Sequence, residues 1–319
     1  MIRLRFYVVT SGLLALLAVA ANAQYAGGTT GSGTSGETVF RSNNHISFER
    51  PEAWGLKYFA SASLMSGLPA PALTEDAHFG SISVGMEMDW LPQLSTSQQI
   101  IGFNGTTPEG LNNAPIFARP WVRIGLPGKF TAVVAAPPPF ELFGVRAHLL
   151  ALGLERPLLE RTHWTLAWRG YGQVGSVKGA FTCPNSVLAF APGSAGNPTN
   201  CVAQSSDSAL LRYVGSELEL SYRIPRNPKI IPHVAAGGNF LDTAFQTHAQ
   251  VSTGLDETRL WTRGGTFSGT GGVTYLVTKR AAITVDAFYS PLWVKRDATA
   301  SRTNDGLFNV RAMLSYTFR

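Results

Sequence analysis

The sequence predicts an all-β protein, a membrane-spanning antiparallel β-barrel of about twelve strands, with ten or fourteen as alternatives. Only 14% of the 319 residues are charged, against ~25% in soluble domains, yet no stretch beyond the N-terminal region is apolar enough for a membrane helix. Apolar residues recur instead at every second position, the period of a strand with one apolar and one polar face. Connections between these segments alternate between short and long. A barrel explains all three observations, because its lipid-facing residues are spread along every strand.

The chain begins with a pattern typical of a secretory signal peptide. Arg3 and Arg5 precede an apolar run over 6–21, and Ala21 and Ala23 form an A-x-A cleavage site. That run is short of the ~20 residues of a spanning helix, which disfavours an N-terminal membrane anchor. We expect residues 1–23 to be removed and 24–37, rich in Gly, Ser and Thr, to form a flexible lead-in. The barrel then occupies 38–319.

The charge of the exported chain is modest. Removal of residues 1–23 takes away two arginines and no acids, so the formal net charge falls from +6 to +4. There is no basic run or basic patch interleaved with aromatics, so we expect no nucleic-acid partner.

Eleven segments show the alternation of a strand. In the clearest, 81–91, the residues Ile82, Met88 and Trp90 share one face and Glu87 and Asp89 the other. The other segments are 54–64, 121–126, 130–136, 143–154, 164–173, 214–223, 230–241, 267–277, 283–293 and 307–318. Bacterial single-chain barrels have an even strand number, so one strand is missing. We expect it within 38–48 or 98–103.

The connections fall into two length classes. Short ones at 127–128, 155–162, 225–229 and 278–280 contain Pro, Gly and basic residues and are typical of tight turns. Long ones span 91–119, 177–207, 242–260 and 295–306. Outer-membrane barrels have short periplasmic turns and longer outside loops, so the alternation favours this class.

The end of the chain resembles the C-terminal β-signal of bacterial outer-membrane proteins. Leu314, Tyr316 and Phe318 alternate and close on an aromatic, although Arg319 follows where the pattern usually ends. The resemblance implies an outer-membrane location, contact with outer-membrane lipid and recognition by the outer-membrane assembly machinery. It covers the signal peptide and the strand region as a pattern and assigns no family of known function.

Aromatic residues are expected to form two girdles where the barrel meets the lipid headgroups. Near the turn end these are Trp164, Tyr222, Tyr275, Tyr316 and Phe318, and near the loop end Phe240, Tyr289 and Trp293. The alternative, in which these aromatics fill the core of a soluble sandwich, leaves the ending of the last strand unexplained.

Two groups of residues are candidates for function. Cys183 and Cys201 bracket part of the longest loop, and in an exported chain they are expected to form a disulfide. The residues expected to line a polar lumen, and to bind solutes there, are Lys57, Glu87, Asp89, Arg123, Arg146, His148, Arg169, Glu217, Glu219, Arg223, Asp286 and Arg311. So many charges must be paired with each other or hydrated. Two interpretations therefore remain, a lumen filled by salt bridges and a polar passage for solutes.

We therefore expect a porin-like or transport barrel for small polar or amphipathic solutes. One alternative is a structural barrel with a filled lumen that binds partners through its loops, and another is an outer-membrane lipid-modifying enzyme. The six histidines lie in no recognisable nucleophile context and there is no G-x-S-x-G elbow, so we expect no catalytic residue and no enzyme activity. No metal site and no cofactor are predicted.

Overall fold

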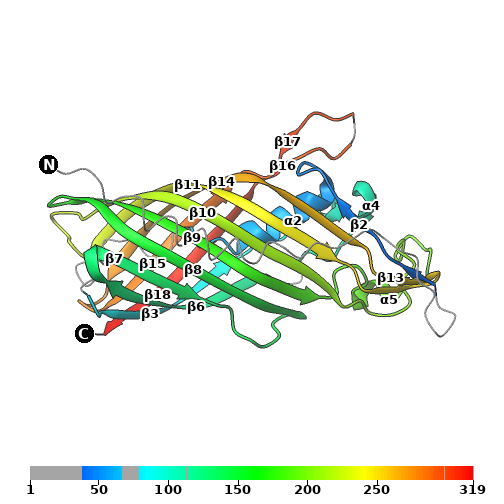
Figure 1. Ribbon diagram of the computed structural model, residues 1–319, viewed down its shortest axis with the longest axis horizontal. Coiled ribbons are helices and arrows are strands. Elements are labelled where there is room, and N and C mark those ends of the chain that lie inside the picture. Colours follow the sequence, from blue (N-terminus) through cyan, green and yellow to red (C-terminus); the bar gives the residue numbers. More distant parts are fainter. Residues whose placement is uncertain (1–37, 67–78, 113, 298, 319) are drawn as a thin grey trace.

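Ten antiparallel strands form a closed barrel in the described part of the chain, residues 38–66, 79–112, 114–297 and 299–318 of this computed structural model. Each strand pairs with the next along the chain, and β18 pairs with β3 to close the barrel (Figure 1). The barrel strands are β3 (Ile82–Trp90), β6 (Ile116–Leu126), β7 (Phe130–Ala135), β8 (Val145–Glu160), β9 (Trp164–Gly179), β10 (Asp207–Tyr222), β11 (Ile230–Gln246), β14 (Arg259–Leu276), β15 (Ala281–Ser290) and β18 (Leu307–Phe318).

The predicted strand number of twelve is wrong, and the alternative of ten is confirmed. The segment 38–48 forms only β1 (Val39–Phe40) and β2 (Asn43–His45), which pair in parallel with β13 (Gly254–Asp256) and β14. The segment 98–103 falls within α3 (Thr96–Gln99), β4 (Ile100–Ile101) and α4 (Gly102–Gly105). None of these elements has the ~9–11 residues that a strand needs to cross a membrane.

The remaining elements are short and lie in the connections. They are β5 (Thr107–Pro108), the 3₁₀ turn η3 (Pro127–Lys129), α5 (Asn185–Leu188), β12 (Ala249–Val251), β16 (Trp293–Val294) and β17 (Thr303–Asn304).

The two ends of the barrel differ as the connection lengths predict. Short turns and the end of β18 gather at one end, which we call the turn end, and the long connections with α5 and β13 gather at the other, the loop end (Figure 1). Outer-membrane barrels have the same division into short periplasmic turns and long outside loops.

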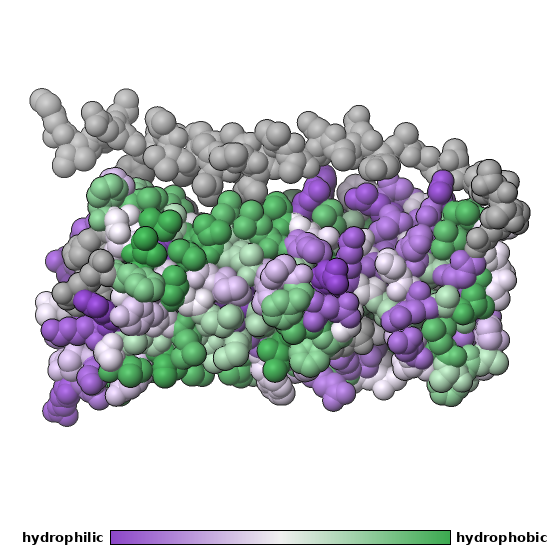
Figure 2. Space-filling model, turned by 90° about the horizontal axis from the view of Figure 1, so that it is seen from below, coloured by the Kyte–Doolittle hydropathy of each residue, from purple (hydrophilic) through white to green (hydrophobic). Residues whose placement is uncertain are grey.

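The outer surface carries an apolar belt. On β18, Phe308, Leu314 and Phe318 are about half exposed, whereas Asn309 and Arg311 are fully buried. The predicted division of this strand into a lipid face and a lumen face is therefore confirmed. Figure 2 shows a zone of mostly hydrophobic side chains over the left half of the barrel wall, with hydrophilic side chains at the left edge and right of the centre.

The predicted girdle aromatics lie at the two edges of this belt. At the turn end Trp164 packs on Tyr222 with ring centroids 4.4 Å apart, and Tyr316 lies 5.1 Å from Phe318. At the loop end Tyr289 is opposite Phe308 in the ladder of β15 and β18 and is exposed.

The barrel wall is taller on one side than on the other. β8, β9, β10, β11 and β14 have between 16 and 18 residues. The other five strands range from 6 residues in β7 to 12 in β18. The tall strands therefore extend past the membrane and form one side of the loop-end mouth.

Helix α2 (Pro51–Ala62) lies inside the barrel, which corrects the strand predicted at 54–64. Nearly every residue of the helix is buried, because barrel wall and loops surround it on all sides. Apolar residues at every second position, with Lys57, Ser61 and Ser63 between them, mimicked a strand. Pro51 and Glu52, which favour the first turn of a helix, were overlooked. We call residues 46–66 the lumen segment.

The predicted signal peptide and lead-in, residues 1–37, lie outside the described residues. Among the described residues, no helix combines the length and the apolar character needed to cross a membrane. The disulfide between Cys183 and Cys201 is confirmed, with their Cα atoms 5.7 Å apart. Recognition of Leu314, Tyr316 and Phe318 by the assembly machinery stays a prediction.

Candidate functional site: a closed lumen and a pocket at the loop end

Two arginines of the barrel wall hold the C-terminal end of helix α2. Arg119 Nη1 donates to the carbonyl oxygen of Ser63 at 2.7 Å, and Arg311 Nη1 donates to that of Leu64 at 3.1 Å. The hydroxyl of Tyr213 also donates to the Ser63 carbonyl, at 2.7 Å. The last carbonyl groups of a helix lack partners within the helix and carry partial negative charge, so cations are favourable there. The lumen segment is thereby attached to the wall near the middle of the barrel.

The same arginines belong to a network of buried ion pairs. Arg119 donates to Glu87 at 2.6 Å, and Arg311 lies 3.7 Å from Glu87 and 3.6 Å from Asp89. Glu87 and both arginines are completely buried. A water-filled channel would leave such side chains exposed, so the lumen is closed at this level.

A second group of ion pairs lies on the adjoining wall. Arg169 contacts Glu155 at 2.6 Å and Glu219 at 3.3 Å, and it also pairs with Glu217. Arg123 shares Glu155 with Arg169. These carboxylates offset the arginine charges, as burial of charge requires.

The structure places most of the predicted lumen residues inside the barrel. Those that face the lumen and are buried are Glu87, Asp89, Arg123, Arg169, Glu217, Glu219, Asp286 and Arg311. Lys57 is buried as well, but on helix α2, where its ammonium group donates to the carbonyl oxygen of Phe48 at 2.7 Å. Whether any of them binds a solute stays a prediction.

Three of the predicted lumen residues lie elsewhere. Arg146 and His148 face outwards on β8, because residues 147, 149 and 151 of that strand take the inward positions. Arg223 follows the last residue of β10 and lies in a turn, where its N–H donates to the carbonyl oxygen of His163.

Several lumen residues were missed by the sequence analysis. Arg119 and Glu155 were assigned to connections because the strands β6 and β8 were drawn too short. Continuing the two-residue period of Arg123 and Trp121 by one step reaches Arg119, so a signal was present. His233, whose Nε2 lies 2.8 Å from Asp286 Oδ1, has the parity of the inward residues of β11.

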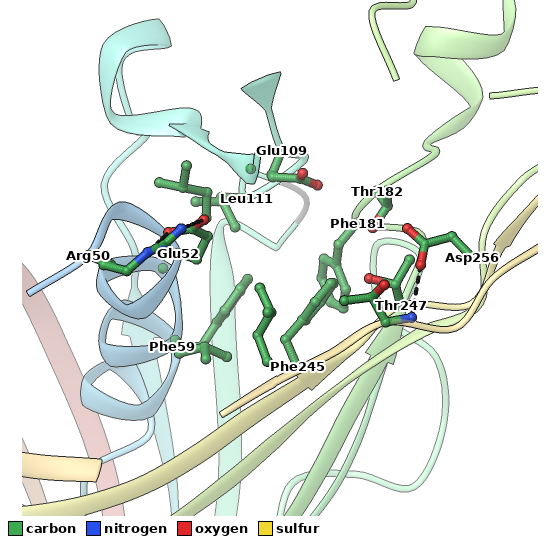
Figure 3. A pocket seen from close by; sticks show the side chains of 16 residues that line it. Arg50, Glu52, Phe59, Glu109, Leu111, Phe181, Thr182, Phe245, Thr247 and Asp256 are labelled. Atoms are coloured by element: carbon green, nitrogen blue, oxygen red, sulfur yellow. Dashed lines mark hydrogen bonds and ion pairs between the residues drawn. The ribbon is translucent and has the colours of Figure 1, made fainter. Parts of the chain in front are cut away.

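A pocket of about 440 Å³ opens at the loop end beside helix α2 (Figure 3). Its apolar wall comes from separate parts of the chain, since Phe59 belongs to α2, Phe181 follows β9 and Phe245 lies near the end of β11. The remaining lining residues are Arg50, Glu52, Gly55, Leu56, Ile101, Gly102, Glu109, Leu111, Thr182, Thr247, Asp256, Thr258 and Leu260. A pocket of this size and lining is typical of a small-molecule site.

Polar groups of the pocket include one ion pair and two further acids. Arg50 pairs with Glu52 at 2.8 Å, and Asp256 accepts a 2.8 Å hydrogen bond from the backbone N–H of Thr258. Burial raises the pKa of the Glu109 carboxyl well above its ordinary value. Negative charge on Asp207, Asp256 and Glu52 raises this pKa further. The pocket therefore combines an apolar body with an acidic polar end.

The loop that carries Phe181 is fixed by Asp207 at the start of β10. One carboxylate oxygen of Asp207 accepts from the backbone N–H groups of Phe181 and Thr182, at 3.0 and 2.7 Å. The disulfide follows at the next residue, Cys183. Asp207 and the disulfide therefore set the position of the pocket wall.

A smaller cavity of about 70 Å³ lies next to the pocket along helix α2. Phe59, Leu111 and Phe181 line both spaces. The smaller one extends the apolar surface towards Phe117 of β6 and Ala147 of β8.

The closed antiparallel barrel, its outward apolar belt with two aromatic edges, and the division into short turns and long loops define the class of protein. This is a bacterial outer-membrane β-barrel protein.

No protein-family model matches the chain, and no curated protein matches it. Among solved structures, the outer membrane protease OmpT from Escherichia coli is 12% identical, with a TM-score of 0.38 over 75% of this chain and 94% of that chain. The toluene transporter TodX of Pseudomonas putida is 10% identical, with a TM-score of 0.32 over 81% of this chain and 95% of that one. Ail, the attachment invasion locus protein of Yersinia pestis, is 11% identical, with a TM-score of 0.24 over 76% and 100%.

Proposed function

We propose that the protein binds small amphipathic molecules from outside the cell in the pocket at its loop end, as the first step of their uptake. The pocket carries this proposal, because it joins an apolar wall to an acidic polar end at the face that is directed outwards. A suitable ligand has an apolar body and a polar end that donates hydrogen bonds or is positively charged. That the protein is not an enzyme stays a prediction.

The closed lumen favours binding over free diffusion of polar solutes. The polar residues expected to line a passage are mostly buried in ion pairs and in contact with the lumen segment. Within the expected range of porin-like and transport barrels, the geometry therefore supports a transport barrel for amphipathic ligands.

A fluorescence titration tests the proposal. N-phenyl-1-naphthylamine, an amphipathic dye that brightens in apolar sites, is added to the folded barrel in detergent and to the variant Thr258→Trp. Thr258 is a half-buried loop residue that lines the pocket, so an indole side chain at this position would occupy the space of the ligand. Thr253→Trp, at an exposed position of the same loop, is the matched control.

We expect saturable binding by the wild type and by Thr253→Trp, and a loss of affinity of about tenfold or more in Thr258→Trp, which corresponds to ~1.4 kcal/mol. Equal binding by all three proteins, or no saturable binding to the wild type, would contradict the proposal.

A further inference from the structure

The barrel wall is interrupted above strand β7. This strand has only 6 residues, and its ladders end where Ala135 is opposite Trp121 on β6 and Ala151 on β8. Beyond that point, one further hydrogen bond of 3.2 Å joins Ala136 N–H to the carbonyl oxygen of Pro120. Residues 116–120 of β6 and 146–150 of β8 then have ladder partners only on their far sides, β3 and β9, within the described chain. Val145, at the start of β8, also bridges to Leu142 of the preceding connection. We call these two facing edges the β7 seam.

The β6 edge of the β7 seam adjoins the apolar belt, whereas the β8 edge, with the outward residues Arg146 and His148, rises above it. Ile116 is opposite Trp90 on β3, and Trp90 is opposite Val310 on β18. Val310 belongs to the outward apolar row of β18, and Ile116 is itself outward and exposed, so the β6 edge continues the apolar outer surface of β18 and β3. Unpaired strand edges at membrane depth are unfavourable unless they line a cavity or are covered by protein.

The sequence itself ends the ladder at this point. Pro137, Pro138 and Pro139 follow β7 directly, and proline has no N–H group to donate to a neighbouring strand. β7 can therefore not continue along β6 and β8.

A second break in the wall, between β14 and β15, is filled. The ladder of these strands ends at the pair Gly269 and Tyr289. Above it, the lumen segment takes over, since Ile46 N–H donates to the carbonyl oxygen of Trp261 at 2.9 Å and Thr262 Oγ1 donates to that of Ile46 at 3.0 Å. The lumen segment thus covers the break between β14 and β15 but not the one above β7.

At the β7 seam no strand pairs with the two edges within the described chain; residues 136–144 connect β7 to β8 there, and the small apolar cavity adjoins it. Phe117 lines this cavity from the β6 edge, and Val145, Ala147 and Leu149 line it from the β8 edge. Phe59 on helix α2 lies behind and also lines the large pocket. Apolar side chains therefore extend from the pocket to the seam.

We propose that the β7 seam is a lateral passage through which an apolar or amphipathic ligand moves between the pocket and the outer leaflet of the membrane. The identity of the ligand rests on the proposed function, whereas the passage is tested without any ligand. Its ligands are molecules that partition into lipid.

The test measures whether lipid tails reach the lumen side of the seam. The chain has two cysteines, which form the disulfide, so a single introduced cysteine can be labelled with bimane. Labelled Ala147→Cys is reconstituted in vesicles of phosphatidylcholine with brominated acyl chains, which quench only at short range. Leu150→Cys, exposed on the outer face of the same strand, is the positive reference. Ala235→Cys is the negative reference, because Ala235 faces the lumen from β11, where both neighbouring strands are paired.

We expect quenching at Ala147→Cys close to that at Leu150→Cys and several times that at Ala235→Cys. Quenching at Ala147→Cys equal to that at Ala235→Cys would overturn the proposal. Val145→Cys repeats the measurement from the same edge if Ala147→Cys does not fold, as judged by its heat-modifiable mobility on gels.

A second variant asks whether the prolines keep the seam open. Replacement of Pro137, Pro138 and Pro139 by Val, Thr and Val restores three N–H donors, so β7 can lengthen. We expect quenching at Ala147→Cys to fall to the level of Ala235→Cys while Leu150→Cys is unchanged, and unchanged quenching at Ala147→Cys contradicts this role of the prolines. A seam that lipid reaches, together with a failed dye titration, would refute the proposed function alone.

Discussion

Arg119 on strand β6 donates a 2.7 Å hydrogen bond to the carbonyl oxygen of Ser63, at the end of helix α2. The same guanidinium pairs with Glu87 at 2.6 Å, so one side chain connects the lumen segment to the charge network of the wall. Both ion-pair partners are completely buried. The strength of this connection determines how firmly helix α2 closes the barrel.

Replacement of Arg119 by Met should loosen helix α2. Glu87 then retains only Arg311, 3.7 Å away, and the Ser63 carbonyl loses one of its donors. Breaking a buried pair by removing one partner costs roughly 3–5 kcal/mol, and we expect the free energy of unfolding to fall by that order. Hydrogen exchange over residues 51–62 should accelerate, and unchanged exchange there would show that Arg119 does not hold the helix.

Arg169 should be a second point of high sensitivity. Its loss in Arg169→Met leaves Glu155, Glu217 and Glu219 close together without their shared cation. We expect a loss of roughly 3–5 kcal/mol in urea unfolding followed by tryptophan fluorescence in micelles.

Arg263→Met is the matched control for the Arg169 variant. Arg263 pairs with Asp242 at 3.1 Å on the outer face, and its side chain is 49% exposed. Such a pair contributes about 0–1 kcal/mol. Equal losses for the two variants would contradict the importance of the buried network.

The raised pKa of Glu109 should make the stability of the protein depend on pH. Burial raises the pKa of this carboxyl, and repulsion from nearby acids raises it further. The native state therefore keeps this proton to a higher pH than the unfolded state does. The native state therefore binds more protons between the two pKa values, and stability falls as pH rises through that interval. Glu109→Gln should remove this contribution, so that the difference in free energy of unfolding between variant and wild type grows with pH. A difference that is constant with pH would be evidence against a raised pKa.

The disulfide should support the pocket. Cys183 directly follows Phe181 and Thr182, which line the pocket. Loss of a bridge that closes a loop of this size costs ~3 kcal/mol in the chain-entropy model. In the double variant Cys183→Ser, Cys201→Ser we expect faster proteolysis within residues 184–200 and weaker dye binding, with the barrel still heat-modifiable. Unchanged proteolysis and dye affinity would mean that Asp207 alone fixes this loop.

Local periodicity was sufficient to predict most of the barrel. The faces of β18 and the polar row of Glu87 and Asp89 follow from the two-residue period, because each strand has lipid on one side and protein on the other. Connection lengths predicted which end carries the loops. The same reasoning failed for α2, since a helix enclosed on all sides shows no polar face from which its period can be recognised.

The pocket could not be predicted in this way. Phe59, Phe181 and Phe245 are brought together only by the path of α2 into the lumen and by the loop after β9. Arg146 and His148 illustrate a related limit, because above the membrane belt an outward row becomes polar and resembles a lumen row. Tertiary contacts, which local pattern does not encode, decide both cases.

The closure of the barrel by helix α2 is tested most directly by recording the ion conductance of the refolded wild type in planar bilayers. We predict no steady conductance, because the buried ion pairs and the lumen segment leave no continuous aqueous path. A steady, reproducible open-channel conductance of the wild type would contradict the closed lumen and return the protein to the porin-like alternative.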